Sequence, residues 1–238
     1  LIPTLADQLK MHTLGKSKVF SIALNSAPAV LSAGFSPDGV YWFDDLSGNM
    51  VTSSYYKKEL PEWVKRFNDK KTARSLASKN WALLKPVSEY RECEADNDSL
   101  EVGFGPGKNT FPYQMEELIK KGGDFSLLKA TPFANTILKS FFLSLMEEEN
   151  VGKDQYPDMV TVFFSSMDKF STDFGPSSME MEYLYLRLDQ EIGEIIHFLE
   201  NSFGKDRFVL YLTSNCSASY PVKILRDRYR IPSGIFAP

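Results

Sequence analysis

Two polar segments that each follow a predicted β-strand hold the side chains of this chain best suited to chemistry. The first segment contains Asp168 and Thr172, and the second contains Asn215 and Cys216. A carboxylate and a thiolate are potential metal ligands, whereas an amide and a hydroxyl are poor ones. The competing interpretation is structural: Asp168 caps a turn or a helix, and Asn215 and Cys216 are ordinary loop residues.

Histidine and cysteine offer little further support for a metal site. The chain has only two histidines: His12 falls in an early polar stretch and His197 in a predicted helix, so neither joins the two polar segments. Cys93 and Cys216 do not have the close spacing of a zinc motif, and their positions do not identify a disulfide.

A strand, a helix and a second strand are predicted to position the two polar segments. Apolar runs at 159–164 and 208–213 predict buried strands, and apolar residues three and four apart predict a helix over 178–203. Such a unit places the two strands parallel, joined by a right-handed crossover. The loops at 165–172 and 214–218 should therefore share one sheet edge, where α/β proteins bind ligands.

The rest of the chain predicts shorter elements around this unit. Residues 18–24 form a β-rich run, and 41–43 and 50–52 flank turn residues, which indicates a hairpin. A helix is predicted over 3–10, with Thr4 as its cap, and another over 134–149. A further helix is predicted from Pro61 onward, with Trp63, Val64 and Phe67 on one face.

These elements predict an α/β fold with a mostly parallel sheet flanked by helices. Glycine and proline punctuate the stretch between Trp81 and Phe125, which indicates an irregular excursion from the main domain. We expect an α/β core built from 1–50 and 126–238 and an irregular α+β cap over 51–125.

Composition indicates a folded protein without a nucleic-acid-binding surface. The hydrophobic fraction is 43% and the aromatic fraction 13%, enough for a packed core, and the net charge of −4 does not favour binding to nucleic acid. No apolar run approaches the roughly 20 residues of a membrane span, and no signal peptide opens the chain. Since the chain starts without Met, we expect it to be the central part of a longer protein.

Motifs along nearly the whole chain follow the pattern of a known family. Residues 163–176 read FFSSMDKFSTDFGP, which is similar to the signature SFSSTDxxGHxFGP. That signature belongs to the alkaline phosphatase superfamily, in the bacterial periplasmic branch related to type I phosphodiesterases and nucleotide pyrophosphatases, which this chain resembles. Residues 180–189 resemble its ExEDxYLRLD run, and 212–217 fall where it has LTADHG. Upstream, residues 17–24, 41–44, 59–64 and 130–136 are also similar, in order.

The resemblance implies a site with two zinc ions held by Asp and His, of which this chain keeps little. The first Asp falls on Asp168, which is retained, but the His four residues later falls on Thr172. The adjacent Asp-His pair of the family falls on Asn215 and Cys216. One carboxylate and one thiol do not make a dinuclear oxygen and nitrogen site, so we expect no cofactor unless a divergent zinc site survives.

The phosphate-binding cations of the branch are replaced as well. The family's KDR falls on Asn25, Ser26 and Ala27, so Asn25 and Ala27 are vestigial substrate-binding positions that can no longer make charge-assisted hydrogen bonds to phosphoryl oxygens. The family's nucleophile precedes the stretch that this chain covers, so no catalytic residue is assigned here.

These replacements predict a pseudophosphatase that retains the fold for binding or structural roles. The alternative is a divergent metal-dependent phosphomonoesterase or phosphodiesterase, holding one metal through Asp168, Cys216 and residues outside this chain. A third interpretation is an interaction module, in which 81–125 forms a cap that faces a partner. The structural alternative is that the aromatic residues of this segment form a small satellite core. The partner is predicted to be an unknown protein or a small phosphate-containing ligand, and the resemblance implies export to the periplasm.

Overall fold

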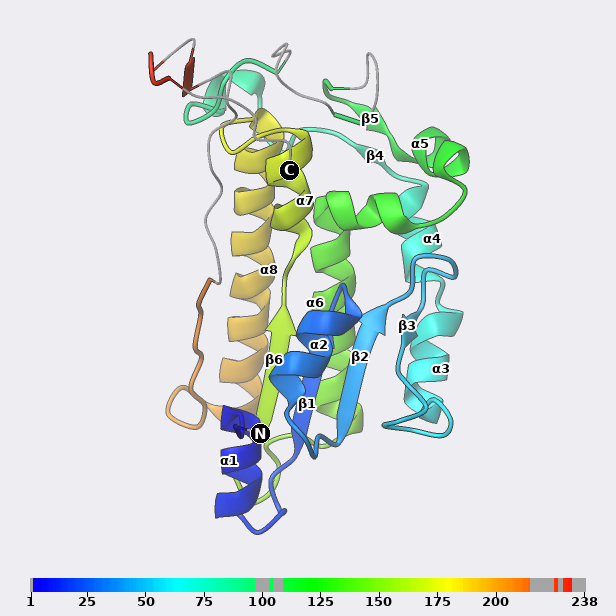
Figure 1. Cartoon of the computed structure of the whole chain (residues 1–238), viewed down its shortest axis with the longest axis vertical. Helices are drawn as coiled ribbons and strands as arrows, with labels where there is room; N and C mark the ends of the chain where they lie inside the picture. The colour runs from blue at the N-terminus through cyan, green and yellow to red at the C-terminus, as the bar shows by residue number, and fades with distance from the viewer. Residues whose placement is uncertain (1, 97–102, 105–108, 215–224, 227–228, 233–238) are drawn as a thin grey trace.

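A four-stranded sheet forms the centre of the molecule, in the order β3-β2-β1-β6 (Figure 1). The computed structural model describes residues 2–96, 103–104, 109–214, 225–226 and 229–232. β1 (Val19–Ala23) is parallel to both β2 (Gly39–Phe43) and β6 (Met159–Phe163), whereas β3 (Met50–Val51) is antiparallel to β2. The predicted mostly parallel sheet and the hairpin are confirmed.

Helices cover both faces of this sheet. The short helix α2 lies on one face, and the long helices α6 and α8 stack against the other (Figure 1). Every residue of β1 is buried, because alternate side chains of a strand point to opposite faces and both faces are covered. The helices of this core are α1 (Leu5–His12), α2 (Ser26–Ala33), α3 (Glu62–Asp69), α4 (Thr72–Ala77), α6 (Pro132–Glu148), α7 (Ser166–Asp173) and α8 (Met179–Phe203).

The predicted helices are confirmed, with small shifts at their ends. Thr4 caps α1 through a capping box with Asp7, as its position suggested. Pro61 precedes α3 instead of opening it, and Trp63, Val64 and Phe67 are all buried on one face. No helix in the described part of the chain is long and apolar enough to cross a membrane.

A second hydrophobic cluster lies beyond the carboxyl ends of the strands and is rich in aromatic rings. It joins a two-stranded ribbon, β4 (Asn80–Trp81) and β5 (Tyr113–Gln114), to α7 and to the start of α8. The elements η1 (Val87–Glu89), α5 (Met115–Gly122) and η2 (Ser126–Ala130) complete this region. The predicted satellite core is confirmed, whereas α5 within the supposedly irregular stretch was not predicted.

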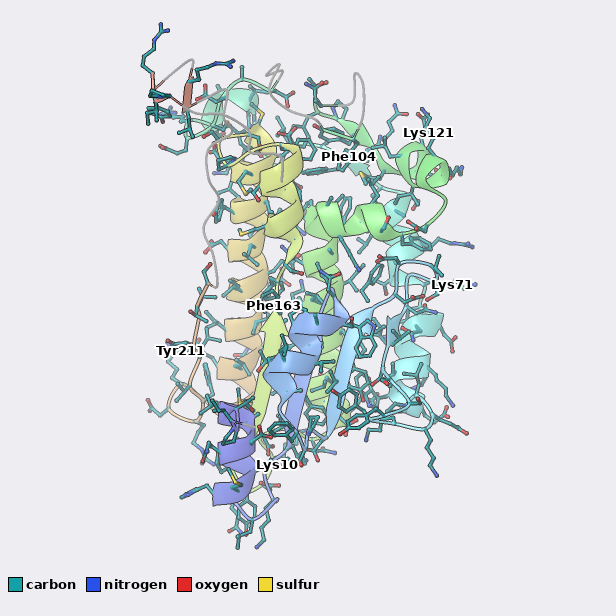
Figure 2. All side chains as sticks on the ribbon, in the orientation of Figure 1. Lys10, Lys71, Phe104, Lys121, Phe163 and Tyr211 are labelled. Atoms are coloured by element: carbon teal, nitrogen blue, oxygen red, sulfur yellow. The ribbon has the colours of Figure 1, made fainter. Side chains whose placement is uncertain are left out.

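The limits of the predicted cap, residues 51 and 125, remain a prediction. Residues 51–125 supply side chains to both hydrophobic clusters: α3 packs into the core beneath the sheet, and the β4-β5 ribbon packs into the aromatic cluster. Figure 2 places Phe104 in the upper part of the molecule, beyond the strands.

Two sequence predictions on the second half of the chain are wrong. Residues 165–172 do not form a loop, since most of them lie in α7. No glycine interrupts this stretch before Gly175, and Phe170 and Phe174 are buried in the aromatic cluster, which stabilises a helix there. Residues 208–213 do not form a buried strand: they lie in no strand, and all but the partly buried Phe208 are exposed.

β6 itself lies where it was predicted but is not fully buried. All five of its residues are partly exposed, in contrast to the buried residues of β1. The difference arises because β6 has a strand neighbour on one side only among the described residues, namely β1.

We predict that Gly34→Ala lowers the free energy of unfolding by about 2 kcal/mol. Gly34 follows α2 with φ of +74° and ψ of −160°, a region that other residues avoid. An added Cβ would lie 2.5 Å from Asp7 Oδ1, and that oxygen accepts the amide hydrogen of Phe35 at 2.6 Å. Urea unfolding followed by circular dichroism measures the change.

Gly193→Ala is the matched control for Gly34→Ala. Gly193 lies inside α8 with open space where a Cβ would be, so alanine should stabilise the helix by about 0.5 to 1 kcal/mol. Equal effects of the two substitutions would contradict the assigned role of Gly34.

Candidate functional site

The carboxyl edge of the sheet assembles the candidate site from several segments. β1 ends at Ala23 and leads through Asn25 into α2, while β6 ends at Phe163 and leads through Ser165 into α7. The turn of η2 and the start of α6 lie over the same edge (Figure 1). The segments that follow β1 and β6 therefore meet at this edge, whereas residues 215–218 of the second predicted loop lie outside the described residues.

Lys129, from η2, lies at the first vestigial substrate position and was not predicted. Its Nζ donates to Asn25 Oδ1 at 2.9 Å and pairs with Asp45 Oδ1 at 2.6 Å. The ammonium also lies 5.9 Å from the centre of the Phe43 ring. The ammonium of Lys129 therefore lies beside Asn25, where the resemblance implies a cation in the family. The carboxylate of Asp45 contacts this ammonium and neutralises its charge.

The other vestigial positions are open to solvent and carry no charge. Asn25, Ser26 and Ala27 are all exposed at the start of α2. The side chain of Asn25 makes no capping hydrogen bond to this helix; its oxygen accepts from Lys129 instead. No sequence signal distinguishes Lys129 from the other lysines, because only the fold brings it from a position 104 residues away to Asn25.

Buried neutral polar groups occupy the edge beside β6. Ser166 Oγ donates to Asn135 Oδ1 at 2.8 Å, and both side chains are fully buried. Asn135 Nδ2 and Ser165 Oγ have no hydrogen-bond partner among the described residues. Hydroxyls and an amide are weak ligands for a divalent cation, so this cluster is suited to holding α6 against α7 rather than to binding metal.

The residues predicted as metal ligands are placed only in part. Asp168 and Thr172 lie four residues apart within α7, one turn from each other along the helix. Asn215 and Cys216 lie outside the described residues. Among the residues that are described, no three His, Cys, Asp or Glu side chains gather closely enough to hold a metal ion.

The histidines lie away from this edge, and Cys93 lies in the aromatic cluster. His12 is exposed in the last turn of α1, at the opposite end of the sheet, and His197 is exposed on α8 (Figure 1). Cys93 is a free thiol in the aromatic cluster. Burial, with a hydrogen bond to Glu182 and its charge, raises the pKa of Cys93 to about 12, so the thiolate form that binds metals is disfavoured.

The sequence of this chain matches a known protein family. The sequence model for type I phosphodiesterase / nucleotide pyrophosphatase matches residues 12–219. The chain belongs to this family. Membership confirms the superfamily and the branch that the motifs at 163–176 and 180–189 resemble.

Relatives and a solved structure support the same assignment. The chain is 35% identical to alkaline phosphatase PafA of Elizabethkingia meningoseptica, over 98% of this chain and 42% of that protein. It is also 35% identical to a Myroides odoratus protein named calcium-transporting ATPase, over 96% of this chain and 42% of that one. The crystal structure of wild-type PafA superimposes with a TM-score of 0.93 at 33% identity, over 98% of this chain and 45% of that chain.

The chain therefore spans less than half the length of these relatives, and its fold is that of the matching part of PafA. The described side chains at the carboxyl edge do not fit the dinuclear zinc site that the family resemblance implies. They offer an ammonium, amides, hydroxyls and the Asp45 carboxylate that pairs with Lys129, and no imidazole.

Proposed function

We propose that this protein is a pseudophosphatase of the type I phosphodiesterase / nucleotide pyrophosphatase family, which retains the fold without phosphoryl-transfer chemistry. The observation that carries the proposal is the state of the phosphate-binding position. Lys129, the cation that touches Asn25, is already paired with Asp45 at 2.6 Å. A phosphoryl group would have to compete with that carboxylate for the ammonium.

The chemistry of the predicted ligand positions supports the same proposal. A dinuclear site needs several carboxylate and imidazole ligands, and the two histidines of this chain are exposed far from the carboxyl edge. Asp168 is the one ligand type retained among the four aligned positions, and Thr172, Asn215 and Cys216 are altered.

The alternative function is a divergent metal-dependent phosphate-ester hydrolase. The retained Asp168 and the 35% identity to an alkaline phosphatase favour it. In this version Asp168 and Cys216 hold a single metal ion together with residues outside the 238. The proposed function and the alternative make opposite predictions for the same variant.

We predict that the protein binds no stoichiometric zinc and that Asp168→Ala changes neither its metal content nor its rate of phosphate-ester hydrolysis. Metal content is measured by mass spectrometry after dialysis against zinc and then buffer. Hydrolysis is measured with p-nitrophenyl phosphate and bis-p-nitrophenyl phosphate, with and without a chelator. Both the 238-residue chain and the full-length gene product are assayed, with PafA as the active control.

Zinc-dependent turnover that a chelator removes would overturn the proposed function. If Asp168→Ala also lowered turnover and zinc content together, the divergent hydrolase would replace it. Lys129→Ala is assayed in parallel as a control at the phosphate-binding position. Because a pseudophosphatase does not hydrolyse phosphate esters, this substitution should leave the measured rate unchanged.

Export to the periplasm is part of the same proposal and rests on the resemblance to exported phosphatases. A retained fold without catalysis is suited to binding a protein partner or a small phosphate-containing ligand. Cell fractionation of the full-length protein tests the location.

A further inference from the structure

A carboxylate of the chain itself holds the place of an anionic ligand at the carboxyl edge of the sheet. Asp45 Oδ1 lies 2.6 Å from Lys129 Nζ, and this oxygen is buried. The side chain of Lys129 is only 16% exposed, so its charge attracts an anion more strongly than a fully solvated ammonium would. The position of Asp45 Oδ1 is therefore one where an anionic oxygen fits against the ammonium.

Backbone contacts, in addition to the ion pair, hold Asp45 in this place. Asp45 lies in the turn of the β2-β3 hairpin, where the amide of Gly48 donates to the carbonyl oxygen of Asp44 at 2.9 Å. The carbonyl oxygen of Asp45 accepts the amide hydrogen of Phe125 at 2.7 Å, and Phe125 directly precedes η2, which carries Lys129. The hairpin turn is thus tied to the segment of the lysine by bonds that do not involve the Asp45 side chain.

The second contact of the ammonium faces solvent. Lys129 Nζ donates to Asn25 Oδ1 at 2.9 Å, and this hydrogen bond is exposed. Asn25, Ser26 and Ala27 are exposed as well, so an anion can reach the ammonium from the start of α2. The positive end of the α2 dipole favours a negative charge beside Lys129.

Asp124 is another carboxylate that interacts with Lys129, but it has a different hydrogen-bond partner. Its Oδ1 accepts the amide hydrogen of Ser126 at 2.9 Å. Hydrogen bonds from Ser126 are the main cause that lowers the pKa of Asp124, and the charge of Lys129 contributes less. Asp45 is therefore the carboxylate whose removal would leave the ammonium without its ion-pair partner.

We propose that the Asp45–Lys129 ion pair is an autoinhibitory contact that closes a binding site for a phosphate-type oxyanion beside the start of α2. When Asp45 is displaced, a phosphate oxygen takes the place of Asp45 Oδ1 on the ammonium. A phosphate group offers more negative charge and more acceptor oxygens than a carboxylate, so it can contact Lys129 and the amides of α2 together. The anion binds and leaves unchanged, in keeping with the proposed function, on which this inference rests.

The test compares phosphate binding by Asp45→Asn and by the wild type. Inorganic phosphate is titrated at neutral pH and constant ionic strength, and NMR shifts of the Asn25 side-chain amide and of the Ser26 and Ala27 backbone amides report binding. Asparagine keeps the size of the side chain and removes its charge. We expect the dissociation constant for phosphate to be at least about 10-fold lower in Asp45→Asn, because the ammonium is free to make a charge-assisted hydrogen bond.

Asp38→Asn is the matched control, because it frees a lysine of almost equal burial. Lys10 and Asp38 also pair at 2.6 Å, with side chains 14% and 38% exposed, against 16% and 39% for Lys129 and Asp45. Figure 2 places Lys10 at the opposite end of the molecule. Lys10 lies in the last turn of α1, where the helix dipole disfavours an anion, so we expect no gain in phosphate binding.

Three outcomes would overturn the autoinhibitory contact. The first is phosphate binding by Asp45→Asn that is no tighter than that of the wild type. The second is an equal gain in Asp38→Asn, which would mean that any freed lysine binds phosphate. The third is a gain that survives in the double variant Asp45→Asn/Lys129→Met, which lacks the ammonium.

Folding and hydrolysis are checked separately from binding. Circular dichroism shows whether each variant is folded, and Asp45→Ser, which also lacks the charge, replaces Asp45→Asn if that variant does not fold. Zinc-dependent hydrolysis by the wild type would overturn the proposed function. Absence of a gain in phosphate binding would overturn the autoinhibitory contact and leave the proposed function standing.

Discussion

Replacing Trp81 with alanine is expected to lower the free energy of unfolding by about 3 to 5 kcal/mol. The indole is fully buried and contacts six other rings among the described residues, including Phe170 of α7, Phe174 directly after α7 and Tyr183 of α8. The centroid distances run from 5.0 Å, to the stacked ring of Tyr113, to 6.5 Å, to Phe174. Alanine would leave a large cavity at the centre of these contacts, and the surrounding rings could fill it only in part.

Urea unfolding followed by circular dichroism measures this loss, and Tyr55→Ala is the control. Tyr55 is 80% exposed, so its replacement should change stability by less than about 0.5 kcal/mol. Hydrogen exchange should also show faster opening of α7, since Phe170 of that helix and Phe174 directly after it pack against the indole. A loss below about 1 kcal/mol for Trp81→Ala would show that the aromatic cluster does not hold β4 to α7.

Glu180→Gln is expected to stabilise the protein by about 3 kcal/mol at pH 8 and hardly at all near pH 4. Glu180 is fully buried, its Oε1 accepts a hydrogen bond from Tyr113 Oη at 2.5 Å, and its Oε2 has no partner among the described residues. Burial is the main cause that raises the pKa of Glu180 from 4.5 to about 7, and the hydrogen bond from Tyr113 opposes it.

The sign of the pH effect follows from proton binding. Between pH 4.5 and about 7 the folded protein holds a proton on Glu180 that the unfolded chain has released, so stability falls as the pH rises through this window. Above pH 7 both states are ionised and the loss is complete. Glutamine keeps the shape and the acceptor for Tyr113 but cannot ionise, so the variant escapes the loss.

The difference in unfolding free energy between the wild type and Glu180→Gln, measured from pH 4 to 8, tests this prediction. Glu147→Gln is the matched control, because Glu147 is exposed on α6 and its replacement should leave the pH dependence unchanged. A constant difference across the pH range would contradict the assigned state of Glu180. The result bears on the fold as well, since Glu180 joins α8 to the β5 strand that carries Tyr113.

Glu180 also shows that the position of a residue along a helix does not determine its burial. The sequence places it in the first turn of a helix, where acidic residues usually complement the helix dipole at the surface. The structure instead buries it beneath the β4-β5 ribbon. Local position along a helix does not say what covers that face, because the cover comes from residues more than 60 positions away.

Predictions from local pattern succeeded where the apolar residues have a regular spacing. β1 was found from its uninterrupted apolar run, and α8 from its apolar residues at helical spacing. The prediction for 208–213 failed because a strand also requires a partner edge, which no local pattern contains.

By itself the sequence determined the family and the positions of β1, β6, α6 and α8, and it suggested the ligand replacements on which the proposed function rests. These are properties of residue type and spacing, which can be read along the chain. The tertiary structure alone decided that Lys129 meets Asn25 and Asp45, that Glu180 is buried, and that β6 has a bare edge. Such features depend on contacts between distant segments, and the free energy of those contacts exists only once the chain has folded.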